Sequence, residues 1–227
     1  MQQENKLQII ENGLVAFFDI LGFKAILSAN GVEESLKIIN NCMLKALDET
    51  RKSPFGLKFK IETFVISDSI LVALPGLTDG TCGLLFLLYC HHLFSGLLFN
   101  GLPTRGAIAF GKFAVLNRSD QIVFVGQPIV DSHELAESLD IAACAVTLSS
   151  ESKVLNDLTR ELFQVHETPR KKLPPCELYL LKYGTEFSRA EMVKYFEQHN
   201  KSLGEGPAKK LSNTIEFLKV SGELKSV

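Results

Sequence analysis

The chain has 227 residues, of which 46% are hydrophobic and 16 are phenylalanines. This content can fill a large core, so it excludes wholesale disorder and fits one large domain, with or without an appendage. The formal net charge is −2, which argues against partners held by bulk electrostatics. We therefore expect no nucleic acid and no membrane among its partners.

Cysteine usage and the N-terminus both bear on the cellular compartment. The cysteines are odd in number, scattered and without a CxxC spacing: Cys42, Cys82, Cys90, Cys144 and Cys176. This usage is typical of reduced thiols rather than of a disulfide framework or a zinc site. The first residues are polar, with no apolar segment behind a basic one, so no secretory signal is expected. The chain is predicted to be cytoplasmic.

Two apolar stretches each carry one aspartate. After a mostly polar lead-in (residues 1–12), Leu14–Ile20 is a predicted strand with Asp19 near its end. Asp68 lies between the predicted strands 57–66 and 69–74, at the tip of an expected hairpin. A buried charge is costly without a partner, and two carboxylates can share a divalent cation. The sequence therefore indicates a metal site at Asp19 and Asp68.

The remaining pattern alternates helices and strands. Helices are expected at residues 32–49, 83–99, 126–139, 188–202 and 208–220, and strands at 103–113, 121–125, 142–148 and 176–183. The apolar helix 83–99 is shorter than the roughly 20 residues of a membrane span, so it is interpreted as a core helix. The basic segment 169–175 is interpreted as a solvated linker. This order predicts an α+β fold, with helices covering an antiparallel or mixed sheet.

Five ordered motifs resemble the class III nucleotidyl cyclase catalytic domain: FFDILGF, FVISDSI, PTRGAIAFG, FVGQPIVDSHELAES and AACAVTLS. The details are more similar to one branch, the pyrimidine nucleotide cyclases of Pycsar antiphage defence. The resemblance covers roughly residues 12–150. It implies a ferredoxin-like βαββαβ core sheet in a catalytic domain of residues 1–183, followed by a C-terminal helical extension, residues 184–227.

The resemblance implies that a nucleoside triphosphate is cyclised to its 3′,5′-cyclic monophosphate, a second messenger in antiviral defence, with release of pyrophosphate. Asp19, Asp68 and the Ile20 carbonyl correspond to the ligands of two Mn²⁺ or Mg²⁺ ions. The backbone amides of Leu21, Gly22 and Phe23 are suited to holding the phosphates. With one such domain per chain, the resemblance also implies a homodimer with composite active sites.

Two departures concern the substrate and the transition state. Phe64 occupies the position of the lysine that reads the purine in adenylate cyclases, and a Phe suits a smaller pyrimidine. UTP is favoured and CTP remains open. The helix 126–139 lacks the family's Arg and Asn, so Arg105 is the nearest candidate cation; a structural salt bridge is the alternative for it. Weaker candidates are Lys24, Lys58, Lys60 and Lys112.

Other hypotheses stay open. His133 and Glu137 lie one helical turn apart and favour a solvent-facing pair over a metal or base role. The chain could be an adenylate or guanylate cyclase, or a catalytically degenerate cyclase-like module that binds a nucleotide. An unrelated α+β interaction domain with Asp residues in its turns is the third possibility.

Overall fold

An eight-stranded sheet is the centre of the computed structural model, which describes residues 6–56, 61–76, 80–118 and 121–225. The strand order is β2-β3-β1-β4-β6-β8-β7, and β5 pairs with β4 off this path. The strands are β1 (Lys6–Ile20), β2 (Glu62–Ile66), β3 (Ser69–Leu74), β4 (Thr104–Arg118), β5 (Gln121–Gly126), β6 (Cys144–Val146), β7 (Phe163–Arg170) and β8 (Leu173–Leu181). The run β2-β3-β1-β4 contains the expected ferredoxin-like core, so the α+β prediction is confirmed.

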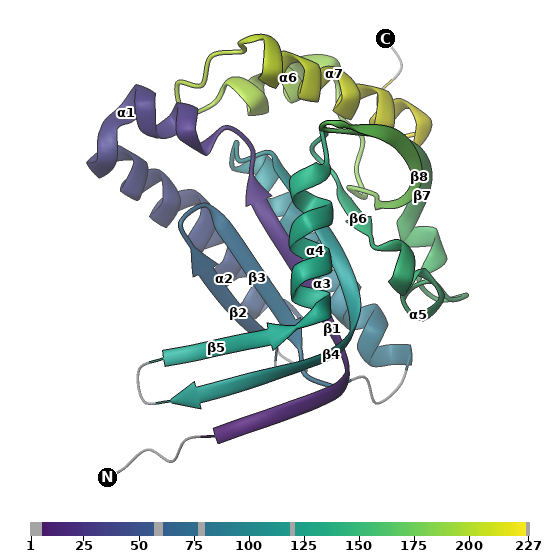
Figure 1. The fold of residues 1–227 in the computed structure, drawn as a ribbon. Coiled ribbons are helices and arrows are strands. Elements are labelled where there is room, and N and C mark those ends of the chain that lie inside the picture. Colours follow the sequence, from purple (N-terminus) through teal and green to yellow (C-terminus); the bar gives the residue numbers. More distant parts are fainter. Residues whose placement is uncertain (1–5, 57–60, 77–79, 119–120, 226–227) are drawn as a thin grey trace.

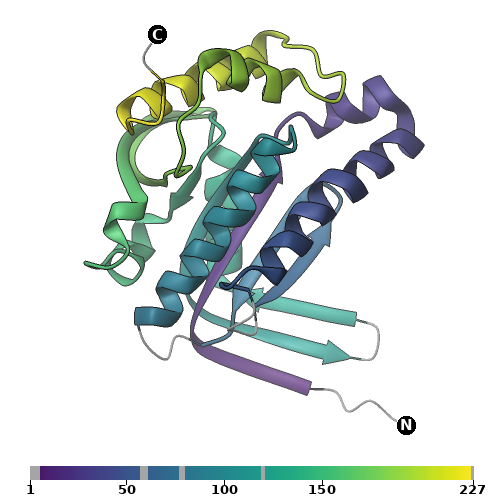
Figure 2. The same cartoon turned by 180° about the vertical axis from the view of Figure 1, so that it is seen from behind.

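Helices cover both faces of this sheet (Figures 1 and 2). The helical elements are α1 (Phe23–Ile38), η1 (Ile39–Leu44), α2 (Lys45–Lys52), α3 (Gly80–Phe99), α4 (Gln127–Ser138), η2 (Leu148–Ser150), α5 (Glu151–Val154), η3 (Arg160–Leu162), α6 (Arg189–Glu197) and α7 (Glu205–Val220). Helix α3 belongs to the main hydrophobic cluster on one face, whereas α4 packs on the other face against β1 and β4.

Strand β1 decides which face carries Asp19. Its residues alternate: Phe18 belongs to the cluster with α3, whereas Val15 and Phe17 belong to the second cluster with Ile129 of α4. Because strand side chains alternate with period two, Asp19 faces the α4 side. The strand is also longer than predicted, since residues from Lys6 onward, expected to be a lead-in, pair with the end of β4.

The hairpin between β2 and β3 is confirmed, while the first helix begins earlier than expected. Ile66 pairs with Ser69, which leaves a two-residue loop. Helix α1 begins at Phe23, nine residues before the predicted start, and is kinked at Gly31, where φ is 71°. Part of the predicted strand 57–66, residues 57–60, lies outside the described residues.

Helix α3 is a core helix, as expected. Residues Thr81–Phe99 have the length and hydropathy of a membrane span, but 56% of this apolar segment is buried within the fold. The side chains of Phe86, Tyr89 and Phe94 are each 1% exposed, whereas Phe99, at the end of the helix, is 47% exposed.

The prediction of a solvated linker at residues 169–175 is wrong. Strand β7 continues to Arg170, and β8 begins at Leu173, so only Lys171 and Lys172 form the tip of a hairpin. Pro169, Pro174 and Pro175 suggested a loop because proline cannot donate to a ladder. Strand β8 pairs with β6 only at Leu180, so its first half has an open edge where prolines are tolerated.

The C-terminal extension packs into the same core as the sheet. Phe187, Phe196 and Phe217 are each at most 4% exposed and belong to the main cluster. The carboxylate of Glu223 accepts hydrogen bonds from the N–H groups of Tyr183 and Gly184, at 3.1 and 2.5 Å. Helices α6 and α7 therefore lie across one end of the sheet (Figure 1). The boundary at residue 183 remains a prediction.

Candidate active site

Asp19 lies at the end of β1, opposite Arg105 of β4 and Ser69 of β3. Its side chain is 14% exposed. Arg105 donates to Asp19 Oδ2 from Nε at 2.8 Å, and its Nη2 lies 2.7 Å from the same oxygen. Ser69 Oγ donates to Oδ1 at 3.3 Å. Burial raises the pKa of Asp19 above its usual value; Arg105 opposes this rise and Asp68 adds to it.

Arg105 joins this carboxylate to the end of α4. Its side chain is 7% exposed, and Nη1 donates to the backbone oxygen of Glu137 at 2.7 Å. Nη2 also pairs with the Glu137 carboxylate at 2.5 Å. The planar guanidinium thus bridges β1 and α4. Arg105 was considered either a phosphate contact or a structural salt bridge, and in this structure it forms a salt bridge.

Asp68 lies at the hairpin tip next to Asp19. Its backbone oxygen accepts from the Ile20 N–H at 3.1 Å. Ser67, before it, has φ 57°, as a residue in a tight two-residue loop requires. The Asp68 carboxylate contributes to the raised pKa of Asp19, so the two carboxylates lie within electrostatic reach of each other.

The donor set suits a hard divalent cation. Asp19, Asp68 and the Ile20 carbonyl offer only oxygen atoms, which Mg²⁺ and Mn²⁺ prefer. Within residues 6–56, 61–76, 80–118 and 121–225, no group of three or more His, Cys, Asp or Glu is arranged to hold a metal. Any ion here would complete its coordination with backbone oxygens, waters or a bound phosphate.

The turn after β1 forms the N-terminus of α1. Gly22 has φ 82°, a left-handed conformation that suits glycine, and its oxygen accepts from Ala25 and Ile26. The Leu21 N–H already donates to the Pro103 oxygen at 2.8 Å. The expectation that Leu21 contributes its amide to a phosphate is therefore corrected, and Gly22 and Phe23 remain.

Phe64 is packed within the protein. Its ring lies 4.3 Å from that of Phe124 on β5 (centroid to centroid), in the second hydrophobic cluster. The open cavity next to Asp19, about 280 Å³, is instead lined by Phe17, Ile66, Ser69, Leu71 and His133. Phe64 is half-buried, so part of the residue remains accessible from outside this cluster.

His133 and Glu137 are both exposed, as the sequence favoured, but each contacts a residue of another element. His133 packs edge-on against Phe17, with centroids 4.9 Å apart, while Glu137 binds Arg105. Of the weaker candidate cations, Lys112 pairs with Glu11 at 2.8 Å, and Lys58 and Lys60 lie outside the described residues.

The sequence analysis did not identify Lys171 as a candidate site residue, because its segment was interpreted as a linker. Its backbone N–H donates to the Ser138 oxygen at 2.6 Å, which docks the hairpin tip on the end of α4. Its amine is half-buried; burial and Arg105 lower its pKa, whereas Glu137 and Asp19 raise it. The run of basic residues at 170–172 was the available signal, but only the tertiary fold brings it near Asp19.

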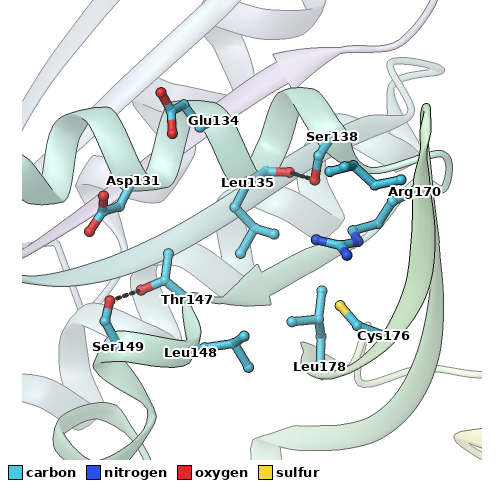
Figure 3. Close-up of a pocket in the computed structure, with 11 residues that line it drawn as sticks. Asp131, Glu134, Leu135, Ser138, Thr147, Leu148, Ser149, Arg170, Cys176 and Leu178 are labelled. Atoms are coloured by element: carbon cyan, nitrogen blue, oxygen red, sulfur yellow. Dashed lines mark hydrogen bonds between the residues drawn. The ribbon is translucent and has the colours of Figure 1, made fainter.

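A groove of about 500 Å³ lies between α4 and the β7–β8 hairpin (Figure 3). Asp131, Glu134 and Ser138 line it from the helix, and the guanidinium of Arg170 from the hairpin points into the gap. Arg170 Nε donates to the Pro174 oxygen at 3.0 Å. The groove is therefore formed by the same α4–hairpin contact that brings Lys171 toward Asp19.

Comparison with known proteins identifies the fold. No family model matches the chain, and no curated protein matches its sequence. The solved structure of the adenylyl cyclase CyaB from P. aeruginosa aligns with a TM-score of 0.58 at 15% identity, covering 78% of this chain and 96% of that one. The fold is that of a class III nucleotidyl cyclase catalytic domain.

Two further structures agree. A non-canonical dimeric guanylyl cyclase domain of the RhoGC fusion protein from the aquatic fungus Blastocladiella emersonii aligns with a TM-score of 0.60 at 13% identity, covering 78% of this chain and 98% of that one. The guanylyl cyclase Cya2 aligns with a TM-score of 0.56 at 13% identity, covering 80% and 94%.

Proposed function

We propose that this chain is a nucleotidyl cyclase that converts a pyrimidine nucleoside triphosphate, with UTP favoured over CTP, to the 3′,5′-cyclic monophosphate and pyrophosphate. The observation that carries the proposal is the position of Asp19 and Asp68. In this fold, Asp19 lies near the end of β1 and Asp68 directly before the adjacent strand β3, and both are beside the N-terminus of α1. The cyclic product would act as a second messenger in antiviral defence, as the motif resemblance implies.

The chain's own residues would position the triphosphate. Asp19 and Asp68, with the Ile20 carbonyl, would hold two Mg²⁺ or Mn²⁺ ions. When bound, such ions neutralise phosphate charge and activate the ribose 3′-hydroxyl. Gly22 and Phe23 would direct N–H groups at the phosphates from the helix N-terminus. Lys171 would add positive charge where negative charge develops in the transition state.

The pyrimidine preference rests on Phe64. A Phe at this position cannot hydrogen-bond a purine edge, and its packing against Phe124 fixes its ring as an apolar wall. We propose a homodimer in which one protomer supplies Asp19 and Asp68 and its partner supplies Phe64. A guanylyl cyclase domain among the structural neighbours is described as a non-canonical dimer, which supports self-association of such domains, and the composite arrangement is our proposal.

A second candidate is a catalytically degenerate module that binds a nucleotide without turnover. The ion pair between Arg105 and Asp19 favours it, because the guanidinium occupies one oxygen of the carboxylate that a metal would need. Helix α4 carries Glu134 and Glu137 but no arginine to stabilise the transition state.

A product assay separates these functions. Purified protein is incubated with ATP, GTP, UTP or CTP and Mn²⁺ or Mg²⁺, and cyclic products are identified by mass spectrometry. Cyclic UMP or cyclic CMP supports the proposal, whereas cyclic AMP alone refutes the pyrimidine assignment. Asp19→Asn should abolish the product, with Asp157→Asn in an exposed loop as the matched control. Nucleotide binding without any product supports the degenerate module.

A further inference from the structure

A second cavity, of about 160 Å³, lies beneath the C-terminal extension. Leu21, Gly22 and Ala25 line it from the start of α1, and Lys201 and Lys210 line it from the extension. The cavity therefore adjoins the same turn that follows Asp19, but its cations come from residues 184–227. Neither lysine has a role in the proposed reaction.

The loop that carries Lys201 is fixed in place. His199 and Asn200 both have left-handed backbones, with φ of 63° and 60°. The His199 ring nitrogen Nε2 lies 2.8 Å from the Asn100 oxygen, and Asn30 Nδ2 donates to the His199 oxygen at 2.9 Å. Asn200 Nδ2 donates to Asn30 Oδ1 at 2.8 Å. These contacts clamp the loop between α1 and the α3–β4 turn, so Lys201 is turned inward.

Lys201 is a buried lysine. It is 7% exposed, and its Nζ donates to the backbone oxygens of Gly101 at 2.7 Å and Tyr195 at 3.4 Å. Among the residues that the structure describes, no carboxylate pairs with it. Burial lowers its pKa to about 7. A buried ammonium without a counter-charge is unfavourable, and an anion in the adjoining cavity would remove that cost.

Two other sources of positive potential reach the cavity. Lys210 Nζ lies 3.3 Å from Asp140, but that carboxylate also binds Lys209 at 2.8 Å, so the local charge is not balanced. Gly22 is the N-cap of α1, which is kinked at Gly31; the N–H groups of Phe23 and Lys24 in its first turn have no acceptor within the helix, whereas that of Ala25 donates to the Gly22 oxygen. The Lys201 Cδ lies 3.4 Å from where a Cβ at Gly22 would be, so the lysine stem directly covers the helix start.

We propose that this cavity binds a phosphate group through Lys201, Lys210 and the start of α1. A tetrahedral oxyanion suits the site because ammonium groups and helix N–H groups both donate to phosphate oxygens. Two sources share this chemistry: the terminal phosphate of a bound nucleoside triphosphate, or free pyrophosphate. Only the first source depends on the proposed cyclase function.

The test measures binding of pyrophosphate by isothermal titration calorimetry, without nucleotide and with EDTA, so that metal-dependent binding at Asp19 and Asp68 does not contribute. Wild-type protein should bind. Lys201→Gln, which keeps a donor for the Gly101 oxygen but removes the charge, should bind about tenfold more weakly or worse. Lys210→Ala should also weaken binding. Lys219→Ala is the matched control, since it removes an exposed lysine of the same helix that pairs with Glu216 rather than Asp140, and its affinity should be unchanged.

Proton uptake gives a second readout. At pH 8 the free Lys201 amine is largely neutral, so binding to wild-type protein should take up close to one more proton per pyrophosphate than binding to Lys201→Gln. Titrations in buffers of different ionisation enthalpy measure this difference. If Lys201→Gln fails to fold, as judged by circular dichroism, the comparison of Lys210→Ala with Lys219→Ala decides instead.

The outcomes are distinct. No binding to wild-type protein, or equal affinity of wild type, Lys201→Gln and Lys210→Ala, overturns the proposal. Competition between pyrophosphate and a non-hydrolysable nucleoside triphosphate supports the site with the substrate as source, and simultaneous binding supports it with free pyrophosphate. Because no turnover is measured, an absence of cyclase activity leaves this result unaffected.

Discussion

Replacing Arg105 with Met should lower the free energy of unfolding more than the removal of any charged side chain from the surface. The substitution keeps a long apolar stem but leaves the Asp19 carboxylate, 14% exposed, without its cation. Breaking a buried ion pair costs about 3–5 kcal/mol, since the remaining charge is uncompensated. Asp19 keeps Ser69 as a donor and some contact with water. We therefore expect a loss near the lower end, about 3 kcal/mol.

Urea unfolding at pH 8, followed by far-UV circular dichroism, measures this loss. Lys112→Met is the matched control, because it breaks a 2.8 Å pair with Glu11 whose side chains are 61% and 66% exposed. Exposed pairs contribute about 0–1 kcal/mol. Adding Asp19→Asn to Arg105→Met should recover part of the stability, because the orphaned charge is then gone. An Arg105→Met loss no larger than that of the control would refute the reasoning.

The loss should also depend on pH. The pKa of Asp19 is higher in the folded protein than in the unfolded chain, so folding favours the protonated carboxyl. The contribution of Asp19 to stability therefore falls as the pH rises from the unfolded-state pKa through the folded-state pKa. Without Arg105 to oppose burial, the pKa rises further. The difference in stability between wild type and Arg105→Met should therefore be large at pH 8 and shrink toward pH 4, where Asp19 becomes neutral.

Three other substitutions test the site. Asp68→Asn should lower cyclase turnover by about 100-fold or more while changing the unfolding free energy by less than about 1 kcal/mol, since its hairpin tip is partly exposed; equal turnover would remove Asp68 from the metal site. Gly22→Ala should cost about 1–2 kcal/mol because φ is 82°, whereas Gly204→Ala, with φ −66° and an open neighbourhood, should cost little in the same urea titration. Lys171→Met should lower kcat/KM by about tenfold with Lys172→Met near wild type; identical kinetics for the two would place Lys171 outside the site.

Local patterns predicted the elements that hold the candidate metal ligands. The apolar run before Asp19 predicted a strand, and Ser67 and Asp68 between two apolar runs predicted a two-residue hairpin, because these signals lie within a few residues. Helix α4 was predicted from Gly126 and Pro128 at its start. The β7–β8 hairpin was missed because its prolines are compatible with a strand only where the neighbouring edge is open.

The contacts within the site could not be predicted, because they depend on register. Arg105 lies 86 residues from Asp19 and 32 from Glu137 in the sequence. Only the antiparallel pairing of β1 with β4 places Arg105 opposite Asp19, and a shift by one residue would turn it to the other face. The docking of Lys171 on the end of α4 likewise follows from a tertiary contact.

The pairing of Arg105 with Asp19 also sets a condition on metal binding. Since Arg105 occupies Oδ2 and Ser69 donates to Oδ1, an incoming cation must share the carboxylate with a fixed positive charge. That arrangement weakens the affinity for a metal ion alone, because like charges within a few ångströms repel. A triphosphate would bring the negative charge that both cations need. The site should therefore bind metal and nucleotide together, and divalent ions without nucleotide should bind weakly.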